Sequence, residues 1–173
     1  KFIEHVNTYH KQKINNFEAL HKWSVENRNC FWNEVWNFYN VIGYKGEEPY
    51  LEPPNNLPGT TFFPNGKLNY AENMLKKSDN DIAITFWSED KIKKKLSWFE
   101  LKNQVAAVAN YFKKKGINKG DRVAAYLPNV PETIIFMLAS SSIGAIFSSA
   151  SPDFGVEGVL DRFGQIDPKM LIT

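Results

Sequence analysis

The residues with the greatest potential for chemistry form one short stretch, Ser148 to Gly155, with the sequence Ser-Ser-Ala-Ser-Pro-Asp-Phe-Gly. Here a run of apolar residues gives way to small polar side chains, then an acid, then a glycine that leads into a helical pattern. Serine hydroxyls can hydrogen-bond a ligand, and the backbone amides at a helix start favour anionic groups. The alternative is structural, with Ser151 and Asp153 capping the turn and the helix. The residue types leave both interpretations open.

Other residues that could carry chemistry are few and poorly spaced. The histidines, His5, His10 and His21, all lie near the N-terminus, and the first two are five residues apart. Two metal ligands on one helix face would be four apart, so we interpret these histidines as surface or packing residues. Cys30 is followed by two aromatic residues, which favours a buried thiol over a nucleophile. The sequence contains neither a Gly-x-Gly-x-x-Gly fingerprint nor a Walker loop.

The candidate stretch belongs to a repeated strand–helix pattern between residues 120 and 173. Two apolar runs, 122–127 and 145–150, are each followed by a segment with helical spacing, and a third run ends the chain. Pro131 suits the first position of the first helix, and Gly144 closes it. The second helix is marked by four apolar residues, Val156, Val159, Leu160 and Phe163. Strands and helices that alternate with short links predict a parallel sheet covered by helices.

Ligands bind such sheets at the carboxyl ends of the strands. The position of a polar residue along its strand therefore indicates how good a candidate it is for binding a ligand. Asn129 follows the first strand and is a weaker candidate of the same kind as Ser151. Asp121 and Arg122 lie at the other end of that strand, where we expect them to fix a turn.

The N-terminal third is predicted to be helical and aromatic. Residues 17–26 fit a short helix capped by Asn15 or Asn16, and residues 31–39 fit a second helix. The second helix carries an apolar stripe that we expect to pack against the body of the protein: Phe31, Trp32, Val35, Trp36 and Tyr39. Residues 43–64 contain five prolines, which predicts an extended connector over the surface rather than a packed element.

The middle of the chain is predicted to hold a hairpin and a long helix. Residues 68–75 fit a short helix, and residues 81–87 fit a strand. A lysine-rich turn that contains Lys91 follows, and we expect the chain to fold back there as a β-hairpin. Ser97 and Glu100 form a capping box. The helix that follows has one apolar face and ends at a glycine: Leu101, Val105, Val108, Ala109, Phe112 and Gly116. The whole pattern predicts an α/β fold, with a helical N-terminal segment, a β-hairpin, and the start of a parallel βαβαβ sheet with helices on both faces.

Composition narrows the class of protein. A length of 173 residues with 43% hydrophobic content suits one globular domain. A net charge of +2 gives no basic field, so we expect no nucleic-acid partner. The uncharged stretch 133–152 holds six serines, which favours a buried helix and strand over a membrane span. One cysteine and no visible signal peptide predict a cytoplasmic location. Because the chain starts at Lys1 and stops inside a predicted strand, we expect it to be an excerpt of a longer protein.

Several stretches resemble a known family. Residues 120–132, Gly-Asp-Arg-Val-Ala-Ala-Tyr-Leu-Pro-Asn-Val-Pro-Glu, are similar to the N-terminal domain of the acyl-CoA synthetases of the adenylate-forming superfamily. Residues 151–169, which begin Ser-Pro-Asp-Phe-Gly, resemble the acetoacetyl-CoA synthetases of that superfamily; acetyl-CoA synthetases usually carry a Phe-Gly-Gly-Phe-Ser-like sequence there. Trp23-Ser-Val-Glu with Phe31-Trp, and residues 63–73, extend the resemblance over nearly the whole chain.

The resemblance implies an ATP-dependent ligase. Such an enzyme converts acetoacetate and ATP into acetoacetyl-adenylate and pyrophosphate with Mg²⁺, and the CoA thiol then displaces AMP. The family's phosphate loop, its acidic and arginine residues and its C-terminal lysine have no counterpart in this sequence. The resemblance therefore implies no catalytic residue and no metal ligand within the chain, and an isolated fragment that is inactive. Ser151, Pro152 and Asp153 match the strand end near the family's CoA nucleotide pocket and are candidate CoA contacts.

The resemblance also suggests a division of the chain. Residues 1–62 would form a helical N-terminal extension and proline-rich connector, and residues 63–173 the first part of the large N-terminal domain. The expected partner is acetoacetate, with no nucleic acid or membrane, and the oligomeric state stays open. One rival is a ligase for acetate or propionate. Others are a non-catalytic nucleotide-binding module, or an interaction domain built on the aromatic N-terminus, which would expose an apolar patch.

Overall fold

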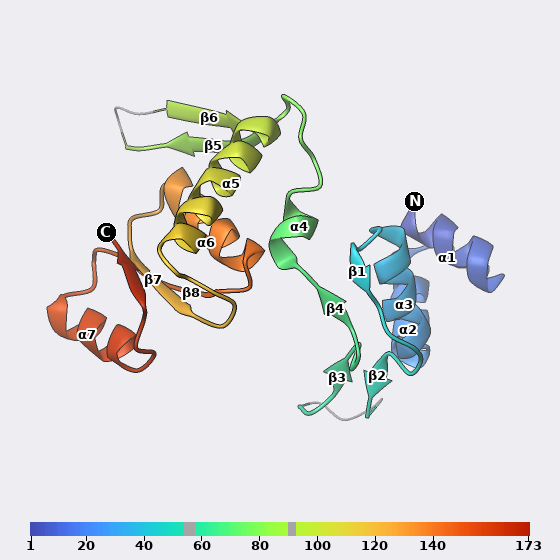
Figure 1. Cartoon of the computed structure of the whole chain (residues 1–173). Helices are drawn as coiled ribbons and strands as arrows, with labels where there is room; N and C mark the ends of the chain where they lie inside the picture. The colour runs from blue at the N-terminus through green and yellow to red at the C-terminus, as the bar shows by residue number, and fades with distance from the viewer. Residues whose placement is uncertain (54–57, 90–92) are drawn as a thin grey trace. The chain divides into compact units, whose positions relative to one another are not determined.

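A computed structural model describes residues 1–53, 58–89 and 93–173 (Figure 1). The chain forms two compact units, Lys1–Leu68 and Asn69–Thr173. Each unit contains its own hydrophobic clusters.

The first unit begins with three helices, of which the sequence pattern singled out the last two. They are α1 (Phe2–His10), α2 (Phe17–Glu26) and α3 (Arg28–Phe38). The side chain of Asn16 accepts a hydrogen bond from the Ala19 amide at 2.8 Å, which confirms one of the two predicted caps. Val6, Ile14 and Trp23 form the core of this unit.

The apolar stripe of α3 packs through its tryptophans and not through its last residue. Trp32 meets Phe62 edge-on, with 5.2 Å between ring centroids, and Trp36 lies 4.9 Å from Phe63. Tyr39 is 63% exposed, so the expectation that it packs is wrong. Tyr39 is the C-cap residue, one position beyond the last residue of the helix, so it is not part of the helix whose face is packed.

Within residues 43–68, the described parts 43–53 and 58–68 form paired strands and not only an extended surface connector. Four strands of two residues form two antiparallel pairs: β1 (Gly43–Tyr44) with β4 (Lys67–Leu68), and β2 (Leu51–Glu52) with β3 (Thr61–Phe62). Leu51 is only 1% exposed and Tyr50 is also buried, so the prediction of an unpacked segment is wrong at these positions. Prolines lack an N–H donor and keep strands short, but they do not prevent neighbouring apolar side chains from being buried.

The second unit starts with the predicted hairpin and long helix. Its first elements are α4 (Tyr70–Met74), β5 (Ile82–Trp87), β6 (Lys93–Ser97) and α5 (Trp98–Lys114). Strands β5 and β6 pair antiparallel, and the turn with Lys91 lies outside the described residues. The capping box at Ser97 and Glu100 is present. Leu101, Val105, Ala109 and Phe112 are buried, Val108 is partly buried against the same core, and Gly116 has the positive φ of a residue that ends a helix.

Replacing Ser97 with alanine should destabilise the start of α5. The Ser97 hydroxyl accepts from the Glu100 amide at 3.2 Å, and losing such a cap typically costs about 1 kcal/mol. We expect faster hydrogen exchange at the first-turn amides of α5 and a lower unfolding temperature. Ser78 is an exposed serine in the loop before β5, and Ser78→Ala is the matched control. Equal effects of the two substitutions would contradict a capping role.

A three-stranded parallel sheet completes the second unit. Its strands are β7 (Arg122–Tyr126), β8 (Ile146–Ala150) and β9 (Met170–Ile172), in the order β8-β7-β9. Helix α6 (Pro131–Ser142) connects β7 to β8, and α7 (Val156–Gly164) connects β8 to β9. Pro131 is the first residue of α6, and Gly144 follows its end with positive φ, as predicted.

Alternate residues of the central strand point to opposite faces of the sheet. Val123 belongs to the main core with Phe112 of α5 and Leu138 of α6. Ala124 belongs to a second cluster with Phe163 of α7. Helices therefore cover both faces, and the predicted fold class is confirmed (Figure 1).

The apolar face of α7 is only partly packed. Phe163 is 7% exposed and Val159 is half-buried, whereas Val156 is 76% and Leu160 67% exposed. The predicted helix is present, but the sheet face beneath it buries only the residues that point at the strands.

Candidate functional site

The turn between β8 and α7 lies at the carboxyl end of β8, where the sequence analysis placed its best candidate. Ser151 follows the last residue of the strand, and Pro152 and Asp153 are exposed. The Ser151 hydroxyl donates to Asp153 Oδ2 at 2.7 Å, and the Asp153 amide lies 3.3 Å from Ser151 Oγ. The Phe154 amide donates to the Ser151 carbonyl at 3.1 Å. Ser151 and Asp153 thus hold the turn together, while α7 begins at Val156 and its N-cap residue, Gly155, provides no side-chain cap.

Tyr126 joins this turn to the central strand. Its hydroxyl lies 2.9 Å from the carbonyl oxygen of Pro152 and 2.9 Å from that of Phe154. Tyr126 is the last residue of β7, and its partners are 26 and 28 positions further along the chain. The sequence analysis did not single it out, although a tyrosine that ends a buried strand is a recognisable signal, since its hydroxyl needs a partner.

A positive charge lies beside the same turn. The guanidinium carbon of Arg162 on α7 lies 4.2 Å from the centre of the Phe154 ring, a cation–π arrangement. Both side chains are exposed, so the guanidinium keeps donors available to an anionic ligand.

The sequence that forms the parallel sheet and this turn matches the model of one protein family. This model matches residues 71–173 and describes AMP-binding enzymes. The chain belongs to the AMP-binding enzyme family. The family match starts within α4 and so falls inside the second compact unit.

Similarity to individual relatives of this AMP-binding chain includes the first unit as well. An acetoacetyl-coenzyme A synthetase of Rhizobium meliloti (strain 1021) is 45% identical over 173 residues, which are all of this chain and 26% of that protein. An acetoacetyl-CoA synthetase of Xenopus tropicalis is 42% identical, with coverage of 100% and 26%. The solved acetoacetyl-CoA synthetase from Streptomyces lividans superposes with a TM-score of 0.87 at 33% identity, covering 98% of this chain and 27% of that one. The chain spans about a quarter of the length of these relatives, and the predicted resemblance is confirmed.

The remaining candidates on the AMP-binding unit have other surroundings. Asn129 lines a depression of about 230 Å³ between β5 and the start of α6, with Trp87 and Ile134 among its neighbours; no residue of the β8–α7 turn lines it. Asp121 accepts from Lys169 Nζ and from the Asn118 amide, each at 2.7 Å. These bonds, that from Lys169 foremost, lower the pKa of Asp121.

Arg122, the first residue of β7, also makes structural contacts at this end of the strand. Its guanidinium donates to the carbonyls of Ile166 and Asp167. The prediction that these residues fix a turn is confirmed for Asp121, which binds the Asn118 amide. It is wrong for the Arg122 side chain, which instead ties β7 to the loop before β9.

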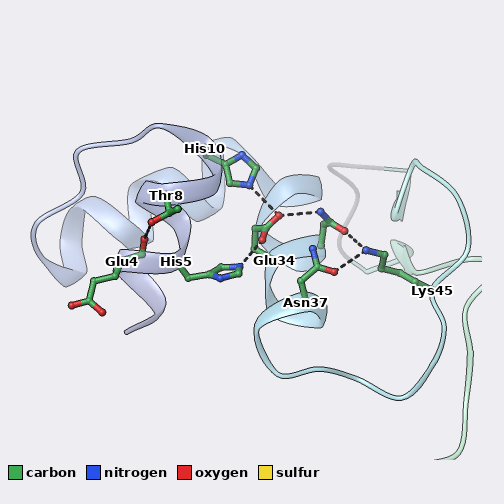
Figure 2. A network of polar contacts seen from close by, with 8 residues as sticks. Glu4, His5, Thr8, His10, Glu34, Asn37 and Lys45 are labelled. Atoms are coloured by element: carbon green, nitrogen blue, oxygen red, sulfur yellow. Dashed lines mark hydrogen bonds and ion pairs between the residues drawn. The ribbon is translucent and has the colours of Figure 1, made fainter.

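Two of the three histidines of the first unit, His5 and His10, converge on a buried glutamate that the sequence analysis missed (Figure 2). His5 Nε2 lies 2.7 Å from Glu34 Oε2, and His10 Nε2 lies 3.1 Å from Glu34 Oε1, the latter without the alignment of a hydrogen bond. The Glu34 side chain is 6% exposed. Asn33 donates to Glu34 and accepts from Lys45, which extends the network. His5 and His10 are packing residues and His21 is exposed, which fits the prediction of surface or packing histidines, but the partner of the first two comes from another helix.

This network is not arranged as a metal centre. Within residues 1–53, 58–89 and 93–173, no three histidine, cysteine, aspartate or glutamate side chains are grouped to hold a metal ion. Cys30 is half-buried against the core around Val6. No helix in the described part of the chain has the length and apolarity to cross a membrane.

Proposed function

We propose that the protein is an acid–thiol ligase that converts acetoacetate and CoA into acetoacetyl-CoA. In the first step a carboxylate oxygen of acetoacetate attacks the α-phosphorus of ATP, forming acetoacetyl-adenylate and releasing pyrophosphate. In the second step the CoA sulfur attacks the acyl carbon, AMP leaves, and the thiol proton is released. The observation that carries the proposal is similarity over the whole chain to acetoacetyl-CoA synthetases. The shared fold of a solved member supports it.

The cofactors ATP, Mg²⁺ and CoA belong to this proposal. The described residues form no group suited to a metal, so we derive no step through Mg²⁺ from this chain. CoA fits the chain better. Ser151, Pro152 and Asp153 lie on an exposed turn at a strand's carboxyl end, and the Arg162 guanidinium beside it suits phosphate oxygens.

The proposal includes the division of the chain into two parts and the cellular location of the protein. Residues 63–173 would supply the first part of the large N-terminal domain of the ligase, with residues 1–62 as its helical extension. A single cysteine and the small-molecule substrate support a cytoplasmic location. No nucleic-acid or membrane partner is part of the proposal.

The proposal is tested by ATP–pyrophosphate exchange with the full-length protein, supplied separately with acetoacetate, acetate and propionate. We expect exchange to be strongest with acetoacetate, because residues 151–169 resemble the enzymes of that acid. Faster exchange with acetate or propionate would keep the reaction class and replace the acid. No exchange with any of the three would favour a non-catalytic nucleotide-binding protein.

A further inference from the structure

Tyr126 connects the sheet to the candidate CoA turn, the residues between β8 and α7. Its ring packs against the cluster of Ala124, Ala150 and Phe163, so packing restrains the direction in which the hydroxyl points. The hydroxyl meets two carbonyl oxygens of one turn, those of Pro152 and Phe154. A phenol carries one proton, so the two carbonyls share a single donor.

The other hydrogen bonds of the turn shape it without holding its tip to the sheet. Ser151 with Asp153, and Ser151 with Phe154, join residues two or three apart in the sequence. The Leu127 amide donates to the Ala150 carbonyl at 3.3 Å, which fixes the base of the turn. The Tyr126 hydroxyl links the tip of the turn to β7.

This contact also determines which backbone groups the turn presents. The peptide bonds after Pro152 and Phe154 are trans, so each N–H points opposite to the carbonyl of the same peptide group. With both carbonyls facing Tyr126, the amides of Asp153 and Gly155 point away from the Tyr126 hydroxyl, and the Asp153 amide donates to Ser151 Oγ at 3.3 Å. The exposed side of the turn therefore presents the Gly155 amide as a backbone donor, next to the Arg162 guanidinium.

We propose that Tyr126 is a positioning residue for CoA: its hydroxyl holds the Pro152 and Phe154 carbonyls inward, so that the Gly155 amide and the outward side chains of the turn meet the nucleotide part of CoA. The proposal rests on the proposed function, because that function identifies CoA as the ligand of the turn. Tyr126 itself touches no reacting atom. Its contribution is to the affinity for CoA, and adenylation of the acid does not depend on it.

The test is Tyr126→Phe in the full-length protein, which removes the hydroxyl and keeps the ring. Loss of one hydrogen bond that orders the turn should weaken CoA binding about three- to tenfold, measured as Kd by calorimetry and as KM in the complete reaction. Hydrogen exchange at the amides of residues 153–158 should become faster. ATP–pyrophosphate exchange, which needs no CoA, should keep its rate. Tyr111→Phe is the matched control, because Tyr111 is 52% exposed on α5.

Four outcomes decide the matter. Weaker CoA binding with unchanged pyrophosphate exchange, and no effect of the control, would support the positioning role. Unchanged CoA affinity in Tyr126→Phe would overturn it, and so would parallel losses in CoA affinity, exchange and unfolding temperature, which indicate a purely structural tyrosine. An absence of CoA binding by the unsubstituted protein would overturn it as well. Failure of the proposed function is seen separately, as an absence of acetoacetate-dependent exchange.

Discussion

Replacing Phe112 with alanine is expected to lower the free energy of unfolding of the second unit by about 3–5 kcal/mol, the usual cost of deleting a buried aromatic side chain. Phe112 is 1% exposed and is the largest fully buried side chain among the described residues. It lies in the core between α5, α6 and the sheet, with its ring centroid 6.3 Å from that of Phe136. Alanine would leave a cavity, because the other contacts of α5, α6 and the sheet prevent these elements from moving in to fill it.

The neighbouring residue provides the control for this substitution. Tyr111 precedes Phe112 on the same helix but is 52% exposed, so Tyr111→Ala should cost less than about 1 kcal/mol. The measurement is thermal or urea unfolding of the full-length protein, combined with hydrogen exchange at the amides of α5. Similar losses for the two substitutions would show that helix propensity or the surface, rather than the core, determines the result.

Replacing Glu34 with alanine is expected to destabilise the first unit by about 2–4 kcal/mol, because it removes one partner from a buried polar cluster and leaves the others unpaired. His5 and His10 come from α1 and Glu34 from α3, so the cluster holds these two helices together (Figure 2). The control is Glu26→Ala. Glu26 is 59% exposed and lies 3.9 Å from Lys22, a surface pair worth less than about 1 kcal/mol. Hydrogen exchange at the amides of α1 reports the effect, and equal protection in both variants would contradict it.

The same glutamate predicts a pH dependence. Burial acts to raise the pKa of Glu34, but the contacts from His5 and His10 outweigh it, so the pKa lies below the ordinary value of 4.5. A depressed carboxyl pKa contributes stability that is present above the unfolded pKa and is lost as the pH falls through the folded one. The protein and its Glu34→Gln variant should therefore differ in unfolding temperature at neutral pH and converge below about pH 4.5. The titratable groups that face or extend this cluster are His5, His10 and, through Asn33, Lys45. A difference that grows with acidity would contradict the assignment.

Much of the fold follows from signals that lie within a few residues of each other. The capping box at Ser97, the proline at position 131 and the glycine at 144 each act on the backbone next to them, so their effect is readable without a partner. The apolar face around Phe112 is equally local, since its members are three or four positions apart. The position of the candidate turn follows from the alternation of strands and helices, because parallel strands place their carboxyl ends at one edge.

Contacts between distant residues could not be predicted in this way. Glu34 looks like a surface residue of an aromatic helix, and it is buried only because two histidines 24 and 29 positions earlier supply its polar contacts. Leu51 lies in a proline-rich segment, and its side chain is buried where β2 pairs with β3. No periodic pattern in the sequence indicates that these two strands pair. The histidine spacing argued against a shared metal-binding face on one helix, but it gave no information about a partner on another.

The sequence by itself therefore determined the order and type of most elements, the sheet edge that carries the candidate site, and the family resemblance, because these depend on local backbone preferences and on residue identity. Only the tertiary structure decided the roles of Glu34 and Tyr126. Burying a charge or a hydroxyl is favourable only when a partner is in place, and the partners of both residues are brought to them by folding.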